Sequence, residues 1–531
     1  MRVVRFHHKS VKKMRHTLLL AFPPPCDRRE FTVPHETSFM QNGTLLAAVD
    51  LGSNSFRLEI GRFEHGHIQR VEYLKETVRQ GNGLDREHNL SLEAMQRGWD
   101  CLARFAERLA DFPRARVRAV ATQTLREARN RDVFLQRGSE ILGHPIDVVS
   151  GPEEARLIYQ GVSRLLPQSS ERRLVVDIGG RSTELILGER FTAQVVASFR
   201  VGSVAWSARY FPDGLFTTQA FATAEIAAKA VLDEALATYR PDTWDVAYGS
   251  SGTIGAVGDI LAAAGHPDGR ITPELLDWLR DRLLRAQSAD RIRLDGLKDD
   301  RRAVIGGGLS ILRALFDLLG IKEMKVAQGA LRQGALFDML DRELPETDLR
   351  SSTVLGLIQS FAVDQAHAER VAKVACRLFA QALPTHTGTG QRKLRWAALL
   401  HEIGCRISHS DYHRHGAYIL DHSDVAGFAQ HELHRLGALV LGHRGKVRKL
   451  EADLNDALFA VQLLCLRLAV ILCHARRDPD EQGLSLTMQG SRFDLSTRSG
   501  WAAAFPQSAY LLREEAYAWQ RSGWELEVTL T

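Results

Sequence analysis

Cysteine is scarce in this sequence, and long apolar stretches are missing from it. The six cysteines are scattered and none forms a CxxC pair, which argues against a disulfide framework or a zinc ribbon and favours a reducing compartment. No apolar run is long enough to cross a bilayer, so we expect no integral membrane segment. The sequence also contains no GxxxxGK[ST] loop, which argues against a P-loop enzyme.

An excess of charge of one sign is nearly absent too. Lysine and arginine number 69 and aspartate and glutamate number 64, so the formal net charge is only +5. This balance gives no reason to expect a nucleic-acid partner, but it suits a polyanionic substrate if the positive charge is clustered. The length of 531 residues and the hydrophobic content of 44% support several domains with real cores.

Residues 1–42 are predicted to form a disordered extension. Their basic start is followed by a short apolar run and three prolines, without a clean small-residue cleavage site, so secretion is disfavoured. We therefore expect a cytoplasmic protein and leave peripheral attachment at the inner membrane open. Met40 stands just before the first predicted strand, so both Met1 and Met40 are candidates for the true start.

An acid followed by a glycine turn occurs twice in the chain. Residues 47–61, AAVDLGSNSFRLEIG, predict a buried strand that ends in Asp50, a tight turn and a second strand. Residues 174–188, LVVDIGGRSTELILG, repeat the pattern, and Asp177 lies 127 residues after Asp50. An ordinary hairpin explains one such turn, but two at domain spacing predict a duplicated fold with a phosphate-and-metal cleft between the halves.

The residue types in these turns suit phosphate chemistry. Glycine lets the backbone approach a ligand closely, and successive N–H groups of such a turn form a nest for anions. Ser53, Asn54 and Ser55 add side-chain donors to the first turn. Asp50, at the strand end, is placed to hold a hard cation such as Mg²⁺ beside the phosphate.

Further strands and helices continue an α/β pattern through residues 47–335. A helix is predicted over 92–110 with Ser91 as its N-cap, and glycine turns recur at 249–253 and 306–308. A second helix begins Glu153-Glu154 directly after a strand. Complementing the helix dipole explains one of these glutamates, but not why the helix follows a strand that would line the cleft.

From about residue 348 to 480 the chain is predicted to be all-helical and rich in histidine. His367, His401-Glu402, His415 and His443 resemble the ligand order of an HD phosphohydrolase, although the usual His-Asp pair is His-Glu here. The segment 466–470, where a closing acid is expected, has none, so satisfied or surface histidines are favoured over metal chemistry. Basic residues of this domain predict a track for a phosphate chain, with a merely solvated surface as the alternative: Arg392, Lys393, Arg414, His415, His443, Arg444 and Lys446.

Several ordered motifs of the chain resemble the exopolyphosphatase / guanosine pentaphosphate phosphatase (Ppx/GppA) family, within the acetate/sugar kinase–heat-shock 70–actin superfamily. The motifs are AVDLGSNSF (48–56), ATQTLREARN (121–130), SGPEEARLIYQGV (150–162), VVDIGGRSTEL (175–185), VGSVA (201–205), GSSGTI (249–254) and GALRQG (329–334). In the C-terminal part, LRWAALLHEIG (394–404), HRHGAYIL (413–420) and GHRGK (442–446) are similar to the long bacterial members. The resemblance covers roughly residues 45–531.

The resemblance implies an α/β fold with a duplicated actin-like (ribonuclease-H-like) core of two lobes. An all-α HD-like domain and a small C-terminal β-rich unit would follow. The expected boundaries are 1–42 for the extension, 43–165 for lobe I, 166–345 for lobe II, 346–480 for the helical HD-like domain and 481–531 for a small α+β unit.

The resemblance also implies roles for individual residues in hydrolysing a terminal phosphoanhydride. Glu154 would activate water and contribute to the metal site, Glu184 would support it, and Arg126 would neutralise transition-state charge. Asp50 and Asp177 would organise Mg²⁺, with stimulation by K⁺ left open. The phosphates would lie on a set of turn residues: Ser53, Asn54, Ser55, Gly179, Gly180, Arg181, Ser182 and Thr183.

Arg181 departs from the family pattern, which usually reads DIGGGSTE. A Cβ at this position would either change the backbone or place a guanidinium where it can bind phosphate in a bidentate manner. We favour a neutral or substrate-contacting change over a loss of activity.

The favoured interpretation is a processive exopolyphosphatase, most like the long bacterial one, that releases orthophosphate from inorganic polyphosphate. The alternative is removal of the 5′ γ-phosphate of guanosine pentaphosphate (pppGpp). Two hypotheses come from other classes of protein. One is a sugar-kinase-like transferase that binds an adenine nucleotide at 249–253 and 306–308, and the other is an inactive polyphosphate-binding protein, motivated by Arg181. A homodimer is implied by the resemblance alone.

Overall fold

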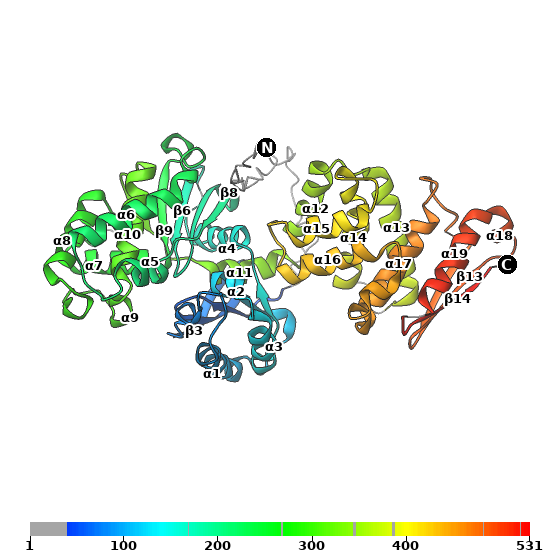
Figure 1. Cartoon of the computed structure of the whole chain (residues 1–531), viewed down its shortest axis with the longest axis horizontal. Coiled ribbons are helices and arrows are strands. Elements are labelled where there is room, and N and C mark those ends of the chain that lie inside the picture. The colour runs from blue at the N-terminus through cyan, green and yellow to red at the C-terminus, as the bar shows by residue number, and fades with distance from the viewer. Residues whose placement is uncertain are drawn as a thin grey trace, which may run out of the picture.

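The computed structural model describes residues 40–167, 169–266, 269–343, 347–384, 388–481, 483–520 and 522–530. Nearly all of the predicted N-terminal extension, residues 1–39, lies outside the described residues. The molecule is elongated, with lobe II at one end, the C-terminal unit at the other, and lobe I and the helical domain between them (Figure 1).

Lobe I is built on a five-stranded sheet with the order β3-β2-β1-β4-β5. β1–β2 and β2–β3 pair antiparallel, whereas β1–β4 and β4–β5 pair parallel. The core of lobe I includes the ring of Trp99 stacked on that of Phe134, with centroids 5.9 Å apart, which joins the two helices over 92–109 and 131–142. The elements are β1 (Leu45–Leu51), β2 (Phe56–Glu64), β3 (His67–Glu76), the 3₁₀ helix η1 (Gln80–Gly83), α1 (Leu92–Leu109), β4 (Val117–Ala121), α2 (Gln123–Glu127), α3 (Arg131–Leu142), β5 (Ile146–Val148) and α4 (Gly151–Ser163).

Lobe II repeats this topology and adds one strand. Its sheet has the order β10-β11-β9-β6-β7-β8, so β8-β7-β6-β9-β11 corresponds to β3-β2-β1-β4-β5. The duplication predicted from the paired turns is therefore confirmed. The elements are β6 (Arg172–Ile178), β7 (Thr183–Glu189), β8 (Thr192–Phe199), α5 (Ser203–Tyr210), α6 (Thr218–Leu232), β9 (Val246–Ser250), α7 (Ser251–Ala263), β10 (Arg270–Ile271), α8 (Pro273–Ala286), α9 (Asp299–Arg302), α10 (Ile305–Leu319), β11 (Met324–Val326) and α11 (Leu331–Asp341).

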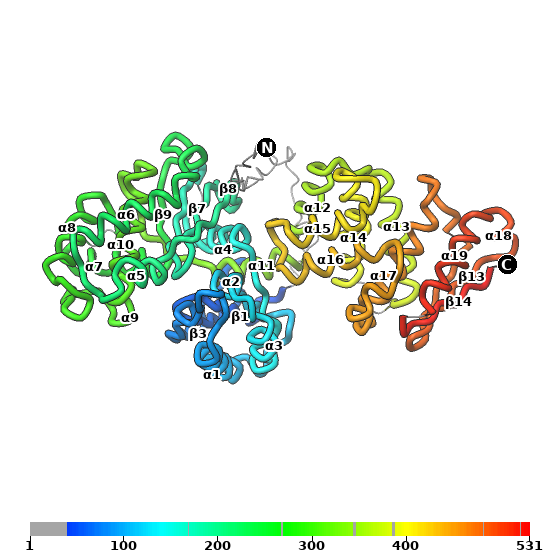
Figure 2. Tube along the Cα trace, viewed as in Figure 1, coloured from blue at the N-terminus to red at the C-terminus, as the bar shows by residue number. Residues whose placement is uncertain are grey.

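The last helix of each lobe packs on the sheet of the other lobe. α4 contacts β6, β7 and β8 of lobe II, whereas α11 contacts β1, β2 and β4 of lobe I. α4 and α11 also lie side by side at the centre of the molecule (Figure 2). The predicted boundaries at 165/166 and 345/346 therefore follow the chain but not the packing, because each lobe borrows a helix from the other.

Glycine makes this crossing of α4 and α11 possible. A Cβ on Gly334 would lie 1.7 Å from the carbonyl oxygen of Leu157, and a Cβ on Gly161 would lie 2.0 Å from that of Ala330. Such distances leave no room for any side chain, so the two backbones touch directly. The glycine repeat predicted as a turn at 306–308 has a related explanation. It lies inside α10, and a Cβ on Gly307 would meet the backbone of Ser207 at 2.5 Å, so this run serves helix packing.

The helical domain and the C-terminal unit share one hydrophobic core. Phe379 and Leu464 of the helical domain belong to the same cluster as Phe493 and Trp519 of the C-terminal unit. The predicted boundary at 480/481 thus separates an all-helical segment from an α+β segment, but both segments share one hydrophobic core. The elements are α12 (Leu349–Ser360), α13 (Gln365–Ala382), α14 (Thr389–Leu399), α15 (Tyr412–Asp421), α16 (Gln430–Gly442), α17 (Ala457–Leu472), β12 (Leu484–Gln489), β13 (Arg492–Thr497), α18 (Trp501–Ala504), α19 (Pro506–Trp519) and β14 (Glu525–Thr529).

Among the residues that the structure describes, no helix combines the length and the apolar character needed to cross a bilayer.

The packing of α11 on α4 predicts opposite effects for one substitution at two helical glycines. Gly334→Ala should destabilise the protein by about 3 kcal/mol or more, because the new Cβ overlaps the backbone of α4. Gly356→Ala, inside α12 with nothing within 4 Å of its Cβ, should instead add up to about 1 kcal/mol of helix stability. Thermal and urea denaturation would measure both, and equal effects of the two substitutions would contradict the close crossing.

Candidate active site

The two glycine turns meet face to face between the lobes. A Cβ on Gly180 would lie 3.0 Å from the Cβ of Ser53, so the turns are packed against each other. The second turn closes on itself, since the backbone N–H of Gly179 donates to the carbonyl of Ser182 at 2.9 Å. Neither Gly179 nor Gly180 has a positive φ, so these glycines are needed for close approach and not for an unusual backbone.

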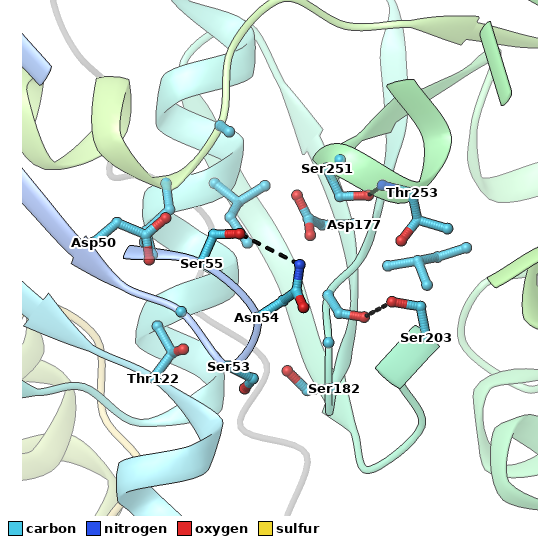
Figure 3. A pocket seen from close by; sticks show the side chains of 18 of the residues that line it. Asp50, Ser53, Asn54, Ser55, Thr122, Asp177, Ser182, Ser203, Ser251 and Thr253 are labelled. Atoms are coloured by element: carbon cyan, nitrogen blue, oxygen red, sulfur yellow. Dashed lines mark hydrogen bonds between the residues drawn. The ribbon is translucent and has the colours of Figure 1, made fainter. Parts of the chain in front are cut away.

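A pocket with about 670 Å³ of empty space, part of it open to solvent, lies where the turns meet. Figure 3 shows side chains of the two turns and of the neighbouring elements pointing into it. Nine of the predicted site residues line the pocket: Asp50, Ser53, Asn54, Ser55, Glu154, Asp177, Gly179, Gly180 and Ser182. Their convergence from three separate segments of the chain fits the predicted phosphate cleft.

Four predicted site residues do not line the pocket but lie behind it or at its edge. Thr183 is fully buried and its hydroxyl donates to the carbonyl of Val201 at 2.6 Å, which holds the turn in shape. Glu184 is buried and accepts a hydrogen bond from Ser198 at 2.7 Å. Arg126 and Arg181 reach other protein groups.

The pocket also contains residues that the sequence analysis missed. The start of α7 contributes Ser251, Gly252 and Thr253, where the positive end of a helix dipole favours an anion. The turn at 249–253 was visible in the sequence, but it was linked to a nucleotide-binding transferase. Two arginines, Arg57 and Arg301, line the pocket as well. Arg57 lies next to the first motif, whereas nothing in the short charged helix α9 distinguishes Arg301.

The equivalent strand ends differ in the charge that faces each aspartate. In lobe I, Asp50 pairs across the hairpin with Arg57, whose guanidinium lies 3.2 Å from the carboxylate. In lobe II, Asp177 pairs across the hairpin with Glu184. Burial, with the nearby Glu154 and Asp50 carboxylates, raises the pKa of Asp177 to about 7. The same causes, burial first and then Glu154 and Asp177, raise the pKa of Glu184 well above its ordinary value. The cleft thus has negative charge that the protein does not compensate.

A hydrogen bond from Arg126 fixes the orientation of Glu154. Arg126 Nη1 donates to Glu154 Oε2 at 2.7 Å and to the carbonyl of Val149 at 2.9 Å. Burial raises the pKa of Glu154, and Arg126 opposes part of that rise. A buried carboxylate of raised pKa beside a pocket, fixed in orientation, is what a general base near neutral pH requires.

The neighbouring Glu153 has the opposite character. It is fully buried, yet Arg156 and Arg118 outweigh the effect of burial and hold its pKa below the ordinary value. Of the two adjacent glutamates, Glu153 is therefore the structural anion and Glu154 the group whose charge can change.

Arg181 forms an ion pair with Glu127. Its Nε and Nη2 donate to one oxygen of Glu127 at 3.0 and 2.8 Å, and Nη1 donates to the carbonyl of Gly81 at 3.2 Å. Glu127 and Gly81 belong to lobe I, so Arg181 of lobe II joins the lobes. Its φ is not positive, which means that the usual glycine can be replaced here without backbone strain. Glu127 also accepts from Gln123, whose amide oxygen in turn accepts from Arg126.

The residues predicted for a phosphate-chain track do not form one uniform surface. Arg392 donates to Asp348 at 2.8 Å, and Lys393 lies 3.9 Å from Glu432, so both are committed to protein carboxylates. His443 is buried, with its ring nitrogens bonded to the carbonyl of Val440 and to the Tyr412 hydroxyl, and thus does not face solvent. His415 is half-buried, and the exposed members are Arg414, Arg444 and Lys446.

Three of the four predicted HD-like histidines come together, because the His401 ring lies 5.6 Å from that of His367 and 5.4 Å from that of His443. His413, and not the predicted His415, has its ring 6.3 Å from that of His443. One ligand atom each of His367, His401 and Glu402 lies within 4.8 Å of the others. Burial, ahead of the opposing Glu402 charge, lowers the pKa of His401 to about 4, so it is neutral. Glu402, however, accepts a hydrogen bond from Arg476 at 2.7 Å, so a guanidinium already compensates its charge. Arg467, on the helix where the acid is missing, is bound to Glu515.

A duplicated actin-like core, a pocket between its lobes lined by hydroxyl and amide groups, and a set of buried carboxylates are the features of a phosphate-processing enzyme. The Ppx/GppA phosphatase family model matches residues 60–343, and the model of Ppx/GppA phosphatase, domain III, matches residues 349–516. The chain therefore belongs to the Ppx/GppA phosphatase family, as its motifs predicted, and is a hydrolase that acts on phosphoanhydrides.

Relatives and solved structures agree with this membership. A Vibrio cholerae protein named guanosine-5′-triphosphate,3′-diphosphate pyrophosphatase is 40% identical over 489 residues, which span 91% of this chain and 98% of that protein. A Pseudoalteromonas translucida protein of the same name is 39% identical over 488 residues, with the same coverage. The crystal structure of an exopolyphosphatase-like protein aligns with a TM-score of 0.51 at 26% identity, covering 55% of this chain and 97% of that one. An exopolyphosphatase from Cytophaga hutchinsonii, with a TM-score of 0.51 at 23% identity over 56% of this chain and 98% of that one, shares the fold.

Charge reversal tests the ion pair between Arg181 and Glu127. Arg181→Glu and Glu127→Arg should each lower the thermal stability and speed hydrogen exchange at residues 79–83, because like charges then meet between the lobes. The double variant restores opposite charges and should recover about 1 kcal/mol relative to the sum of the single effects. Purely additive effects would mean that the two side chains do not bind each other in solution.

Proposed function

We propose that this protein removes the terminal 5′ phosphate of guanosine pentaphosphate by hydrolysis. The observation that carries the proposal is the set of relatives named guanosine-5′-triphosphate,3′-diphosphate pyrophosphatase, which are about 40% identical over nine-tenths of the chain. The pocket supports it, because the two turns and the start of α7 offer hydroxyl and backbone donors to a phosphate chain. Inorganic polyphosphate, which the sequence analysis favoured, is the second candidate substrate.

The pairing and burial of the basic residues in the helical domain favour the nucleotide over a long polyphosphate as the substrate. A track for a polymer needs cations that are free to bind successive phosphates. Of the seven residues proposed for it, Arg392 and Lys393 are paired with acids and His443 is buried. The exposed Arg414, Arg444 and Lys446 keep polyphosphate as a candidate, but they do not extend the pocket by themselves.

We further propose Mg²⁺ as the cofactor. Asp50, Asp177 and Glu154 supply oxygen ligands, which this hard cation prefers, and all three are buried at the pocket. The raised pKa values of Asp177 and Glu154 express uncompensated negative charge that a cation would relieve. When bound, Mg²⁺ would neutralise part of the charge on the phosphates.

The chain's own residues account for the rest of the reaction. The turns and the arginines Arg57 and Arg301 hold the terminal phosphate, while Glu154 orients a water molecule toward its phosphorus and takes up the proton of that water. The new P–O bond forms as the bond to the bridging oxygen breaks, and the electron pair leaves with that oxygen. Arg126 keeps Glu154 in place through their hydrogen bond at 2.7 Å.

Glu154→Gln should lower kcat by about 10²–10⁴-fold with little change in KM, because the amide cannot accept the proton. Phosphate release from guanosine pentaphosphate and from long-chain polyphosphate, measured in Mg²⁺, checks both the role and the preference. Glu107→Gln, an exposed glutamate of α1, is the matched control and should keep full activity. Faster turnover of polyphosphate would reverse the substrate assignment, and an active Glu154→Gln would remove Glu154 as the base.

The pKa of Asp177 makes Mg²⁺ binding depend on pH. Its folded value of about 7 exceeds the ordinary value, so the group contributes stability below the unfolded pKa and loses it as pH rises through 7. Mg²⁺ must displace this proton, so the rise in melting temperature that it causes should be small near about pH 5.5 and large near about pH 8. Differential scanning fluorimetry measures this, with Asp177→Asn as the control that should lose the stabilisation at both pH values. An equal rise at both pH values in the wild type would contradict the assignment.

A further inference from the structure

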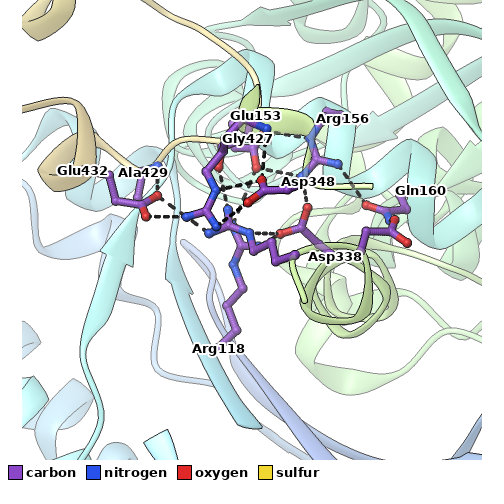
Figure 4. Close-up of polar contacts among 12 residues, drawn as sticks. Arg118, Glu153, Arg156, Gln160, Asp338, Asp348, Gly427, Ala429 and Glu432 are labelled. Atoms are coloured by element: carbon purple, nitrogen blue, oxygen red, sulfur yellow. Dashed lines mark hydrogen bonds and ion pairs between the residues drawn. The ribbon is translucent and has the colours of Figure 1, made fainter. Parts of the chain in front are cut away.

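A buried ionic network joins the helical domain to the first turn of α4. Figure 4 shows side chains of both lobes and of the helical domain meeting there. Glu153, fully buried, accepts from Arg156 Nε and Nη2 at 2.8 and 2.9 Å, and Arg118 lies 3.6 Å away. Arg118 and Arg156 also contact Asp338 of α11. Arg118 and Arg156 thus link Glu153, in the first turn of α4, to Asp338 of α11.

The helical domain completes this network through its own backbone. The N–H of Gly427 donates to Glu153 Oε2 at 2.7 Å, a charge-assisted bond in a buried place. Two residues further on, Ala429 forms an isolated antiparallel bridge with Val149. The segment 427–429 therefore contacts Val149, just before the α4 N-cap Ser150, and Glu153, in the first turn after it.

These two contact points flank the residues that orient Glu154. Val149 gives its carbonyl to Arg126 Nη1, and the same nitrogen donates to Glu154 Oε2. The N–H of Glu154 donates to the carbonyl of Ser150 at 2.9 Å. A shift of the strand end or of the first helical turn would therefore move Glu154 and Arg126 together.

The segment 427–429 is itself held rigidly. Arg342 Nη2 donates to the carbonyl of Gly427 at 2.6 Å, and Glu432 Oε2 accepts from the N–H of Ala429 at 3.1 Å. Arg350 binds Glu432 at 2.8 Å. The side chain of Arg350 also lies beside the glycine, since a Cβ on Gly427 would be 3.0 Å from the Cγ of Arg350. With φ at +86°, Gly427 is a position where other residues are strained.

We propose that segment 427–429 of the helical domain positions the water-activating Glu154 by holding Val149 and Glu153. The inference rests on the proposed function for the role of Glu154. Gly427 and Glu153 are positioning residues in this view, because they act on the reaction only through Glu154. The helical domain would then be required for fast turnover even if no part of it touches the substrate.

Gly427→Ala tests the proposal against Gly500→Ala. Both glycines have positive φ, +86° and +78°, so both substitutions strain the backbone, but Gly500 lies at the start of α18 and away from α4. Gly427→Ala should lower kcat on guanosine pentaphosphate by about ten- to hundredfold with KM within about twofold, since a misplaced base costs rate more than binding. Gly500→Ala should keep the wild-type kcat.

Hydrogen exchange at residues 149–154 gives a readout that does not depend on activity. These amides should exchange faster in Gly427→Ala than in the wild type, and at the wild-type rate in Gly500→Ala. Arg342→Met, which removes the donor to the Gly427 carbonyl without straining the backbone, should act in the same direction as Gly427→Ala and serves if that variant does not fold.

The outcomes separate this inference from the proposed function. Wild-type kcat and wild-type exchange in both Gly427→Ala and Arg342→Met would overturn the positioning role. If the wild type hydrolyses neither substrate, the proposed function fails, and exchange at residues 149–154 still decides whether segment 427–429 holds the start of α4.

Discussion

The chemistry of the cleft depends on negative charge that the protein leaves uncompensated on one side. The two lobes present aspartates at equivalent strand ends, but Asp50 faces Arg57 whereas Asp177 faces Glu184. Both aspartates are buried, and burial, with the carboxylates of Glu154 and Asp50 nearby, raises the pKa of Asp177 to about 7. The two halves of the duplicated fold therefore differ in charge: an arginine faces the aspartate of lobe I, and a second carboxylate faces the aspartate of lobe II.

The close crossing of α4 and α11 brings this charge to the pocket and keeps it there. Each helix ends one lobe in sequence and covers the sheet of the other in space, so the lobes cannot separate without breaking a glycine-lined backbone contact. The adjacent glutamates at the start of α4, Glu153 and Glu154, have different roles. Glu153 anchors the turn in an ionic network, and Glu154 faces the pocket with a raised pKa.

Local sequence patterns predicted the fold because they depend on neighbouring residues. The repeated strand–acid–glycine turn identified the duplication, and the capping serine of α1 accepts from Ala94 as its spacing predicts. Contacts between distant segments were not predictable in this way. The partner of Arg181 is Glu127, 54 residues earlier, and nothing in either local pattern indicates that pairing. Arg301 was missed for the same reason, since only the folded chain places α9 against the start of α7.

The helical domain illustrates how a ligand pattern in sequence can differ from the chemistry of the folded site. His367, His401 and His443 converge as the HD-like order suggests, yet guanidinium groups occupy positions around them. Arg476 binds Glu402, and Arg467 replaces the missing acid and donates to the carbonyl beside His443. A cation entering such a site would have to displace or tolerate these positive charges, and the charge on Arg467 is buried. The charged side chains near the lobes are instead paired inside the domain, with Arg350 on Glu432 and Arg392 on Asp348. Across the junction, Arg342 lies 3.7 Å from Glu432 and the N–H of Gly427 donates to Glu153. Those contacts favour an architectural contribution of this domain to the cleft over chemistry of its own.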